Sequence, residues 1–319
     1  MSEGPHQSPI SPGRSWYEDS VGERPRYPAM DGSLGVDVAV VGGGFTGLSA
    51  ALHLAKSGVR VALLEGARFG DGASGRNGGQ LGTGHRLWPE EMEAAYGLER
   101  ARALFALAED AKRGLLQTLE TNGIDADYRV GQLSVAHRAR LVRDYREHAE
   151  AMRERFGYPH IHFMDAEETA ERLGSPRYHG GVRDTGTGHL HPMKLLVGTA
   201  RAAAAAGALL FENSAARGFR RTAGGFEVET GGGALRAERL LLATNAHGGD
   251  LEPRNAAHVM PIRSFIGATE PVPDPAGVLP GGEAVDDSRF VVRYFRKTAD
   301  NRLLFGGREA YGASSEAGD

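Results

Sequence analysis

Cysteine is absent from this 319-residue sequence, and tryptophan occurs only twice. The absence of cysteine excludes disulfides, thiolate zinc sites, cysteine nucleophiles and cofactors tethered through sulfur. Neither sign of charge dominates, because 37 Lys and Arg residues stand against 41 Asp and Glu residues. A protein that binds nucleic acid through many phosphate contacts is therefore not expected.

Long apolar segments are also missing. The N-terminus has no apolar core of the kind that signal peptides carry, and the most apolar window, residues 36–55, contains Asp37, three consecutive glycines and His53. A buried strand, turn and helix explain this window better than a membrane span. We therefore expect no membrane span and a cytoplasmic location.

Glycine is the residue in surplus, with 46 copies and no collagen-like period. We expect these glycines in tight turns and where the backbone closely approaches a ligand. The chain length suggests two domains with room for a buried ligand site. Residues 1–30 are polar and rich in proline, which predicts an N-terminal arm rather than a domain.

Residues 36–64 have the pattern of a strand, a glycine turn, a helix and a second strand. Val36–Val41 and Val59–Leu64 are short apolar runs without alternation, typical of strands buried on both faces. The helix between them ends at Gly58. One face of that helix carries Leu48, Ala51, Leu52 and Ala55. The unit predicts a parallel sheet with a right-handed crossover.

The rest of the chain changes from helices to strands. Helices are predicted over 89–121 and 192–206, and a short helix begins with a capping box of Asp165 and Glu168. The alanine run at 202–206 is typical of a low-complexity linker too, but its apolar flank keeps helical spacing. Strands are predicted over 132–136, 208–211, 226–230, 235–244, 262–269, 290–296 and 302–305.

Gly42, Gly44 and Gly47 form a G-x-G-x-x-G motif at the first strand-to-helix turn. Gly42 permits the turn, Gly44 lets the backbone approach a pyrophosphate, and Gly47 allows close packing of helix on strand. Glu65 ends the second strand, where a carboxylate accepts hydrogen bonds from a ribose diol. This order predicts an adenine dinucleotide, and the alternative is a glycine-rich turn in another α/β protein.

A second glycine-rich segment, Gly72 to Gly82, favours FAD over NAD. A nicotinamide domain usually continues directly into its next helix, whereas this segment suggests backbone wrapped over the ribityl and ring end of FAD. Ser74, Arg76 and Asn77 add side-chain donors. A solvated surface loop is the alternative, and a nicotinamide dehydrogenase is a more distant one.

Several strings resemble the D-amino-acid-oxidase (DAO) type of FAD-dependent oxidoreductase. They are VVGGGFTGLSAALHLA, LLEGARFGDGASGRNGGQL, GHLHP, TNAHGGD and TADNRLLFGG. GASGRNGGQ is the most specific string, and within the family the strings are most similar to enzymes that oxidise gamma-glutamylputrescine. The resemblance runs from about Ser15 to the last residue.

This resemblance implies an α/β fold in which a Rossmann-like FAD-binding domain of the GR2/DAO type is interleaved with an antiparallel β-sheet substrate domain. Residues 31–85 and 192–250 would form the first domain, and residues 86–191 and 251–319 the second. Family members continue into a glycine-rich C-terminal stretch that covers the flavin. Because the sequence stops before it, we expect a C-terminally truncated chain with an incomplete substrate domain.

The resemblance also implies which residues hold a non-covalent FAD. Residues 42–47 would hold the pyrophosphate, Glu65 the adenosine ribose, residues 74–81 the flavin ring and Ala216 the adenine, and residues 243–246 would lie beside the dinucleotide. The predicted cofactor-binding residues are Gly42, Gly44, Phe45, Thr46, Gly47, Glu65, Ser74, Arg76, Asn77, Gly78, Gly79, Gln80, Leu81, Ala216, Ala243, Thr244 and Asn245.

The candidate catalytic residues are His191, Arg263 and Tyr294. His191, like His189 in the same GHLHP string, could accept or relay a proton, and the alternative is a helix cap or a core hydrogen bond. No cluster of acids or histidines supports a metal site there. Arg263, Tyr294 and Arg296 lie on strands expected over the flavin and could bind a substrate carboxylate. The alternative for each is a solvated strand face.

The predicted function is oxidation of the C–N bond of a gamma-glutamylputrescine-like amine. The imine would hydrolyse to an aldehyde and ammonia, and the electrons would pass to dioxygen. The partners are thus a small amine and dioxygen, and nothing in the sequence indicates the oligomeric state. Two alternatives stay open: an amino-acid or N-methyl-amino-acid oxidase of the same fold, and a flavin-binding fragment without catalysis.

Overall fold

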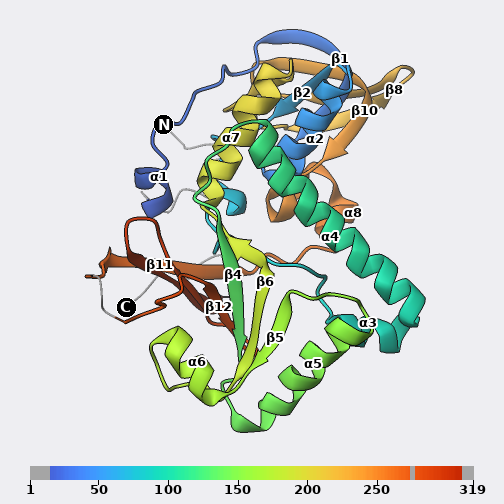
Figure 1. Cartoon of the computed structure of the whole chain (residues 1–319). Helices are drawn as coiled ribbons and strands as arrows, with labels where there is room; N and C mark the ends of the chain where they lie inside the picture. Colours follow the sequence, from blue (N-terminus) through green and yellow to red (C-terminus); the bar gives the residue numbers. More distant parts are fainter. Residues whose placement is uncertain (1–14, 274–276, 311–319) are drawn as a thin grey trace. The chain divides into compact units, whose positions relative to one another are not determined.

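A computed structural model describes residues 15–273 and 277–310 of the chain. These residues form two compact units, each assembled from segments that are far apart in the sequence (Figure 1). Unit 1 contains the described residues up to Asn77, together with residues 121–126 and 192–261. Unit 2 contains residues 78–120 and 127–191 and the described residues from Ile262 onward.

Unit 1 is built on a six-stranded sheet. Its strands, in spatial order, are β7 (Leu209–Phe211), β2 (Val61–Leu64), β1 (Gly32–Val41), β10 (Gly233–Leu242), β9 (Gly225–Glu229) and β8 (Gly218–Thr222). The four strands from β7 to β10 pair in parallel, and β9 and β8 continue the sheet antiparallel. The parallel pairing of the first two strands in the chain confirms the order predicted from their unbroken apolar runs.

Both faces of the parallel strands are buried. One face packs against α2 (Phe45–Lys56) and α7 (Pro192–Ala205), which lie side by side in Figure 1. The predicted alanine-rich helix is therefore present, and Ala200 and Ala203 belong to this core. The apolar side chains of the other face form a second buried cluster, which also contains Met30 and Val228 of β9. The remaining helical elements of unit 1 are α1 (Trp16–Ser20), η1 (Ala73–Gly75), η3 (Asn245–His247), η4 (Gly249–Leu251) and α8 (Pro253–Ala256).

Unit 2 is built on an eight-stranded sheet. The strands, in spatial order, are β11 (Arg263–Pro271), β14 (Arg302–Ala310), β13 (Tyr294–Lys297), β12 (Ala284–Asp287), β4 (Arg129–Val135), β6 (Gly181–His189) and β3 (Gln80–Leu81), and β5 (Ile161–Met164) also pairs with β6. The sheet is mixed, because β12 pairs in parallel with β4, while the other strand pairs of the described sheet are antiparallel. The antiparallel sheet expected from the sequence is therefore present, with one parallel pair in it.

The helices of unit 2 differ from the prediction at Gly97. The single helix expected over 89–121 is two helices, α3 (Pro89–Tyr96) and α4 (Leu98–Thr121). Gly97 adopts φ +82°, outside the helical region, and so separates them. The other helical elements are η2 (Ala139–Leu141), α5 (Val142–Glu154) and α6 (Ala166–Leu173). The predicted cap of α6 is present, because the Asp165 carboxylate accepts the Glu168 N–H at 2.9 Å.

The strand prediction fails at residues 290–293. Only Tyr294–Lys297 form a strand there, and Phe290 is 93% exposed, so the apolar residues before Tyr294 are not strand core. The sequence analysis also missed β6, whose segment GVRDTGTGH contains three glycines and little apolar character. Its pairing with β4 and β5, rather than local propensity, defines that strand.

Candidate cofactor site

The turn after β1 is formed by glycines that the backbone geometry requires. Gly42 adopts φ +107°, and a Cβ on it would lie 2.5 Å from the Ala243 carbonyl oxygen. A Cβ on Gly47 would lie 1.9 Å from the Gly42 carbonyl oxygen, too close for any side chain. The G-x-G-x-x-G residues therefore hold β1, α2 and the end of β10 in close contact.

Helix α2 begins at this turn without a side-chain cap from its N-cap residue, Gly44. The Phe45 N–H donates to Ser74 Oγ at 3.1 Å. Among the described residues, the N–H groups of Thr46 and Gly47 donate to no protein acceptor. The start of α2 therefore has the donors and the partial positive charge that suit an anionic group.

Glu65 follows β2 directly and lies beside the glycine turn. Its carboxylate accepts the Gly43 N–H at 2.7 Å and the Ala67 N–H at 2.9 Å. No basic side chain pairs with it in the part of the chain that the structure describes. A half-buried carboxylate held by two N–H donors keeps lone pairs for further hydroxyl donors.

Two other predicted segments of unit 1 lie next to these residues. The Ser214 N–H donates to the Glu65 carbonyl oxygen at 2.8 Å, which brings the chain leading to Ala216 beside Glu65. The Ala243 N–H donates to the Val41 carbonyl oxygen at 2.7 Å, so the residues after β10 lie beside the residues after β1.

A pocket of about 510 Å³ opens at the end of β10. Thr244 and Asn245 line it, together with residues from η4 and α8. β1 and β10 are adjacent and parallel, while the connection from β1 leads away to β2 on the other side. Carboxyl ends of strands at such a reversal of strand order are where open α/β sheets bind ligands. The geometry of unit 1 thus fits a dinucleotide.

The predicted donors of the 74–77 segment are engaged with their own loop. The Arg76 Nε–H donates to the Asp71 carbonyl oxygen at 2.9 Å, and the Asn77 amide donates to the Ser74 carbonyl oxygen at 2.9 Å. These two side chains therefore shape the loop, whereas Ser74 reaches the start of α2.

The rest of the glycine-rich segment belongs to unit 2. The Leu190 N–H donates to the Gly79 carbonyl oxygen at 2.8 Å. The Gln80 side-chain amide donates to the Val285 carbonyl oxygen at 3.0 Å. Leu81 is paired with β6 in an antiparallel ladder. Gly78 accepts a hydrogen bond from Arg296 Nε at 2.6 Å. Arg296 is 4% exposed, so it is neither on a solvated strand face nor open to a ligand from bulk water.

The three predicted catalytic residues lie on different parts of unit 2. His191 is buried beyond the end of β6, Arg263 is exposed at the start of the edge strand β11, and Tyr294 is half-buried on β13. The ring of Tyr294 fills the space over Gly78 and Gly306, where an added Cβ would lie 2.8 Å and 2.0 Å from it. The described structure gives no contact between Arg263 and Tyr294.

A pocket of about 470 Å³ in unit 2 lies beside Tyr294. It is lined by Arg86, Ser264, Arg289, Phe290, Val291, Val292, Tyr294 and Gly307. Arg289 is ion-paired with Asp287, whereas Arg86 is exposed and has no ion pair among the described residues. Neither arginine was predicted from the sequence, because neither lies in a recognisable motif.

Unit 2 also holds half-buried carboxyl groups to which no sequence motif points. Asp286 accepts hydrogen bonds from Gln132 at 2.8 Å and from Ser134 at 2.7 Å, and burial raises the pKa of its carboxyl group. Asp184 accepts the Tyr158 hydroxyl at 2.8 Å, and burial raises its pKa as well. Asp286 lies on β12 and Asp184 on β6, with β4 between the two strands, and no local pattern reveals this pairing.

His189 is a neutral histidine at the end of β6. It is 1% exposed, its Nε2–H donates to the Gly282 carbonyl oxygen at 2.8 Å, and its Nδ1 is buried with no partner among the described residues. Burial lowers the pKa of His189 to about 4. This histidine is a core hydrogen-bonding residue, which is the alternative that the sequence analysis left open for the GHLHP string.

The low pKa of His189 predicts an acid-sensitive fold. The unfolded chain takes up this proton below about pH 6.5, whereas the folded chain does so only near pH 4. Above pH 6.5 the His189 ring is neutral in both the folded and the unfolded chain, so its titration does not lower the free energy of unfolding. That titration lowers the free energy of unfolding by up to about 3 kcal/mol as the pH drops to 4.

Urea unfolding between pH 4 and pH 7.5 checks this. His189→Gln keeps a donor for Gly282 without the titrating ring, so its unfolding free energy is expected to fall less steeply with acid than that of the unsubstituted chain. His179→Gln, at an exposed position of unit 2, serves as the control and is expected to keep the original slope. Parallel profiles for His189→Gln and the unsubstituted chain would overturn the expectation.

Comparison with known proteins agrees with the site geometry. The family described as FAD dependent oxidoreductase (DAO) matches residues 37–319. A probable oxidoreductase OrdL of Rhizobium meliloti (strain 1021) is 59% identical over 309 residues, which cover 97% of this chain and 72% of that protein. The gamma-glutamylputrescine oxidoreductase of Escherichia coli (strain K12) is 36% identical over 302 residues, or 94% of this chain and 70% of that protein.

Solved structures show the same fold. Glycine oxidase from Geobacillus kaustophilus superposes with a TM-score of 0.68 at 25% identity, covering 89% of this chain and 74% of that one. L-amino acid deaminase from Proteus vulgaris superposes with a TM-score of 0.70 at 21% identity, covering 89% and 64%. These superpositions confirm the predicted α/β fold, with a partly parallel sheet in unit 1 and a second, mixed sheet in unit 2. Among the described residues, no helix is long and apolar enough to cross a membrane.

Proposed function

This chain belongs to the DAO family of FAD-dependent oxidoreductases, and from that premise we propose that it oxidises the C–N bond of a gamma-glutamylputrescine-like amine. The observation that carries the proposal is its 36% identity, over 94% of the chain, to a protein described as gamma-glutamylputrescine oxidoreductase. The amine would lose two electrons and two protons to give an imine, which water hydrolyses to an aldehyde and ammonia. Dioxygen would accept the electrons and protons and become hydrogen peroxide.

We propose that FAD binds non-covalently with its adenosine side on unit 1. Residues 31–85 and 192–250 would form the FAD-binding domain, and residues 86–191 and 251–319 the substrate domain. The free N–H groups of Thr46 and Gly47 support a pyrophosphate at the start of α2, and the carboxylate of Glu65 supports a ribose diol. Ala216 and residues 243–245 would complete the adenine and pyrophosphate contacts.

The flavin, when bound, supplies the two-electron acceptor, and the protein supplies position and charge. Residues 74–81 would lie along the ring, with Arg296 holding the Gly78 carbonyl and Gln80 tied to β12. Tyr294, Arg86 and Arg289 line one pocket, whose guanidinium groups suit the carboxylate of a gamma-glutamyl group. His191 and Arg263 stay candidates for proton relay and carboxylate binding.

Anaerobic reduction of the FAD-loaded chain by a panel of amines tests the substrate. Gamma-glutamylputrescine is expected to bleach the visible flavin absorbance fastest. Putrescine, which lacks the carboxylate, is expected to act more slowly. After air is readmitted with excess amine, peroxide and aldehyde should accumulate in equal amounts.

Glycine and sarcosine represent the alternative of an amino-acid or N-methyl-amino-acid oxidase. Faster bleaching by either of them than by gamma-glutamylputrescine would contradict the proposed substrate and favour that alternative. FAD that stays bound and unbleached with every amine would instead favour a flavin-binding chain without catalysis. Arg86→Gln, compared with Arg140→Gln at an exposed position in η2, separates carboxylate recognition from general effects of charge.

A further inference from the structure

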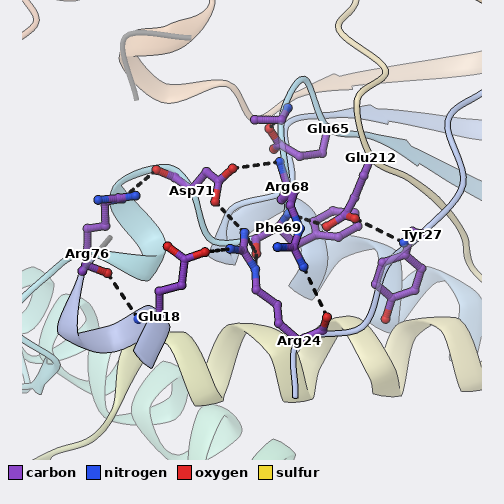
Figure 2. Close-up of polar contacts among 11 residues, drawn as sticks. Glu18, Arg24, Tyr27, Glu65, Arg68, Phe69, Asp71, Arg76 and Glu212 are labelled. Carbon is purple, nitrogen blue, oxygen red and sulfur yellow. Dashed lines mark hydrogen bonds and ion pairs between the residues drawn. The ribbon is translucent and has the colours of Figure 1, made fainter. Parts of the chain in front are cut away.

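The arm before β1 is packed onto the loop that follows Glu65, and both belong to unit 1 (Figure 2). Arg24, only 6% exposed at its side chain, donates to the Phe69 carbonyl oxygen through Nε at 3.0 Å and through Nη2 at 2.7 Å. Its Nη2 also donates to Asp71 Oδ1 at 2.6 Å, and its Nη1 contacts Glu18 at 3.3 Å. One buried guanidinium thus fixes two neighbouring points of the loop.

Phe69 connects this arginine to the glycine turn. The Phe69 ring is buried beneath Gly43, where an added Cβ would lie 2.3 Å from it. The Phe69 N–H donates to Glu212 Oε1 at 2.8 Å, while Glu212 Oε2 accepts the Tyr27 N–H at 3.2 Å. Arm, loop and glycine turn therefore share one set of buried contacts.

The same loop carries Ser74, which contacts the start of α2. Asp71 Oδ2 accepts the Arg68 N–H at 3.2 Å, and η1 follows with Ser74, whose Oγ accepts the Phe45 N–H at 3.1 Å. The arm itself is anchored elsewhere, because Arg201 of α7 donates to the Glu23 carbonyl oxygen at 2.7 Å. The loop between Glu65 and Ser74 is consequently held from outside the nucleotide motif.

We propose that Arg24 is a positioning residue for the dinucleotide site. It fixes the loop 66–74 so that Phe69 supports the glycine turn and Ser74 holds the first N–H of α2. The proposal rests on the proposed binding of FAD to unit 1. A loop released from Arg24 occupies the binding-competent arrangement for a smaller fraction of the time, and the affinity for FAD falls by that fraction.

Titration of FAD into variants tests the proposal. Arg24→Ala is expected to raise the dissociation constant for FAD at least about tenfold, a loss of about 1.4 kcal/mol. Arg24→Lys is expected to recover only part of the affinity, because a lysine cannot bridge Phe69 and Asp71 as a guanidinium does. Arg26→Ala is the matched control, since Arg26 is exposed two residues away and has no ion pair among the described residues.

Chemical rescue separates positioning from general destabilisation. Guanidinium chloride at about 20 mM, far below denaturing concentrations, is expected to lower the dissociation constant of Arg24→Ala towards that of the unsubstituted chain. Sodium chloride at the same concentration should not. A merely structural loss would not be reversed by so little guanidinium, so the absence of rescue together with unchanged affinity in Arg24→Lys would overturn the proposal.

Hydrogen exchange in the absence of FAD gives an independent readout. Residues 66–77 of Arg24→Ala should exchange faster than in the unsubstituted chain, while the amides of α7 keep their rates. Equal exchange of the loop would overturn the positioning role whether or not FAD binds. If the unsubstituted chain binds no FAD at all, the proposed function fails, and that result is distinct from a failure of the Arg24 assignment.

Discussion

Replacing Glu65 by glutamine is expected to raise the dissociation constant for FAD by roughly ten- to a hundredfold. The carboxylate accepts the Gly43 N–H at 2.7 Å and the Ala67 N–H at 2.9 Å. A glutamine has one acceptor oxygen, so its NH₂ group would face one of these two donors. A ribose hydroxyl of bound FAD would also lose its charged acceptor, and loss of a hydrogen bond to a charged group costs about 1.5–3 kcal/mol, which corresponds to that range of affinity.

Flavin fluorescence titration of purified variants measures this effect. Glu238→Gln is the control, because Glu238 is exposed on β10 and its ion pair with Arg239 lies on the surface. This variant is expected to bind FAD with an affinity within about twofold of that of the unsubstituted chain, since exposed ion pairs contribute little. Equal affinity for Glu65→Gln and Glu238→Gln would mean that the ribose of FAD does not lie at Glu65.

Replacing Gly47 by alanine is expected to destabilise unit 1 by about 3 kcal/mol or more. The new Cβ would lie 1.9 Å from the Gly42 carbonyl oxygen and 3.3 Å from a methyl carbon of Val40. Neither the backbone oxygen nor the buried strand can move aside without disturbing the sheet, which is what makes overpacking costly. The affinity for FAD should fall as well, because the start of α2 is displaced.

Urea unfolding followed by circular dichroism measures the loss. Gly35→Ala is the matched control on β1 of the same unit, because a Cβ there meets nothing within 4 Å. Its effect is expected to stay within about 0.5 kcal/mol. If Gly47→Ala were as stable as Gly35→Ala, the close packing of α2 on the glycine turn would be contradicted.

The sequence could predict the glycine turn and its acid because both depend on local constraints. Gly42 needs a positive φ, and the strand before it is an unbroken apolar run, so the order of elements follows from neighbours in the chain. Gly97 also adopts a positive φ, but a helical pattern continues on both sides of it, so the break between α3 and α4 was not predicted. A single glycine in a periodic segment does not show which φ it adopts.

The contacts that the sequence could not predict join distant segments. Arg24 and Phe69 are 45 residues apart, and Glu212 and the Phe69 N–H are 143 residues apart. Neither pair has a fixed spacing that a pattern could reveal, because tertiary packing alone brings them together. The parallel pairing of β12 with β4 has the same origin.

The visible absorption spectrum of the purified chain, after incubation with excess FAD and exhaustive dialysis, tests the central claim most directly. We expect the two visible bands of oxidised flavin to remain, at about one FAD per chain, and denaturation to release the flavin because no covalent bond holds it. A colourless dialysed chain would contradict the claim that the glycine turn, Glu65 and the start of α2 form an FAD site in this protein.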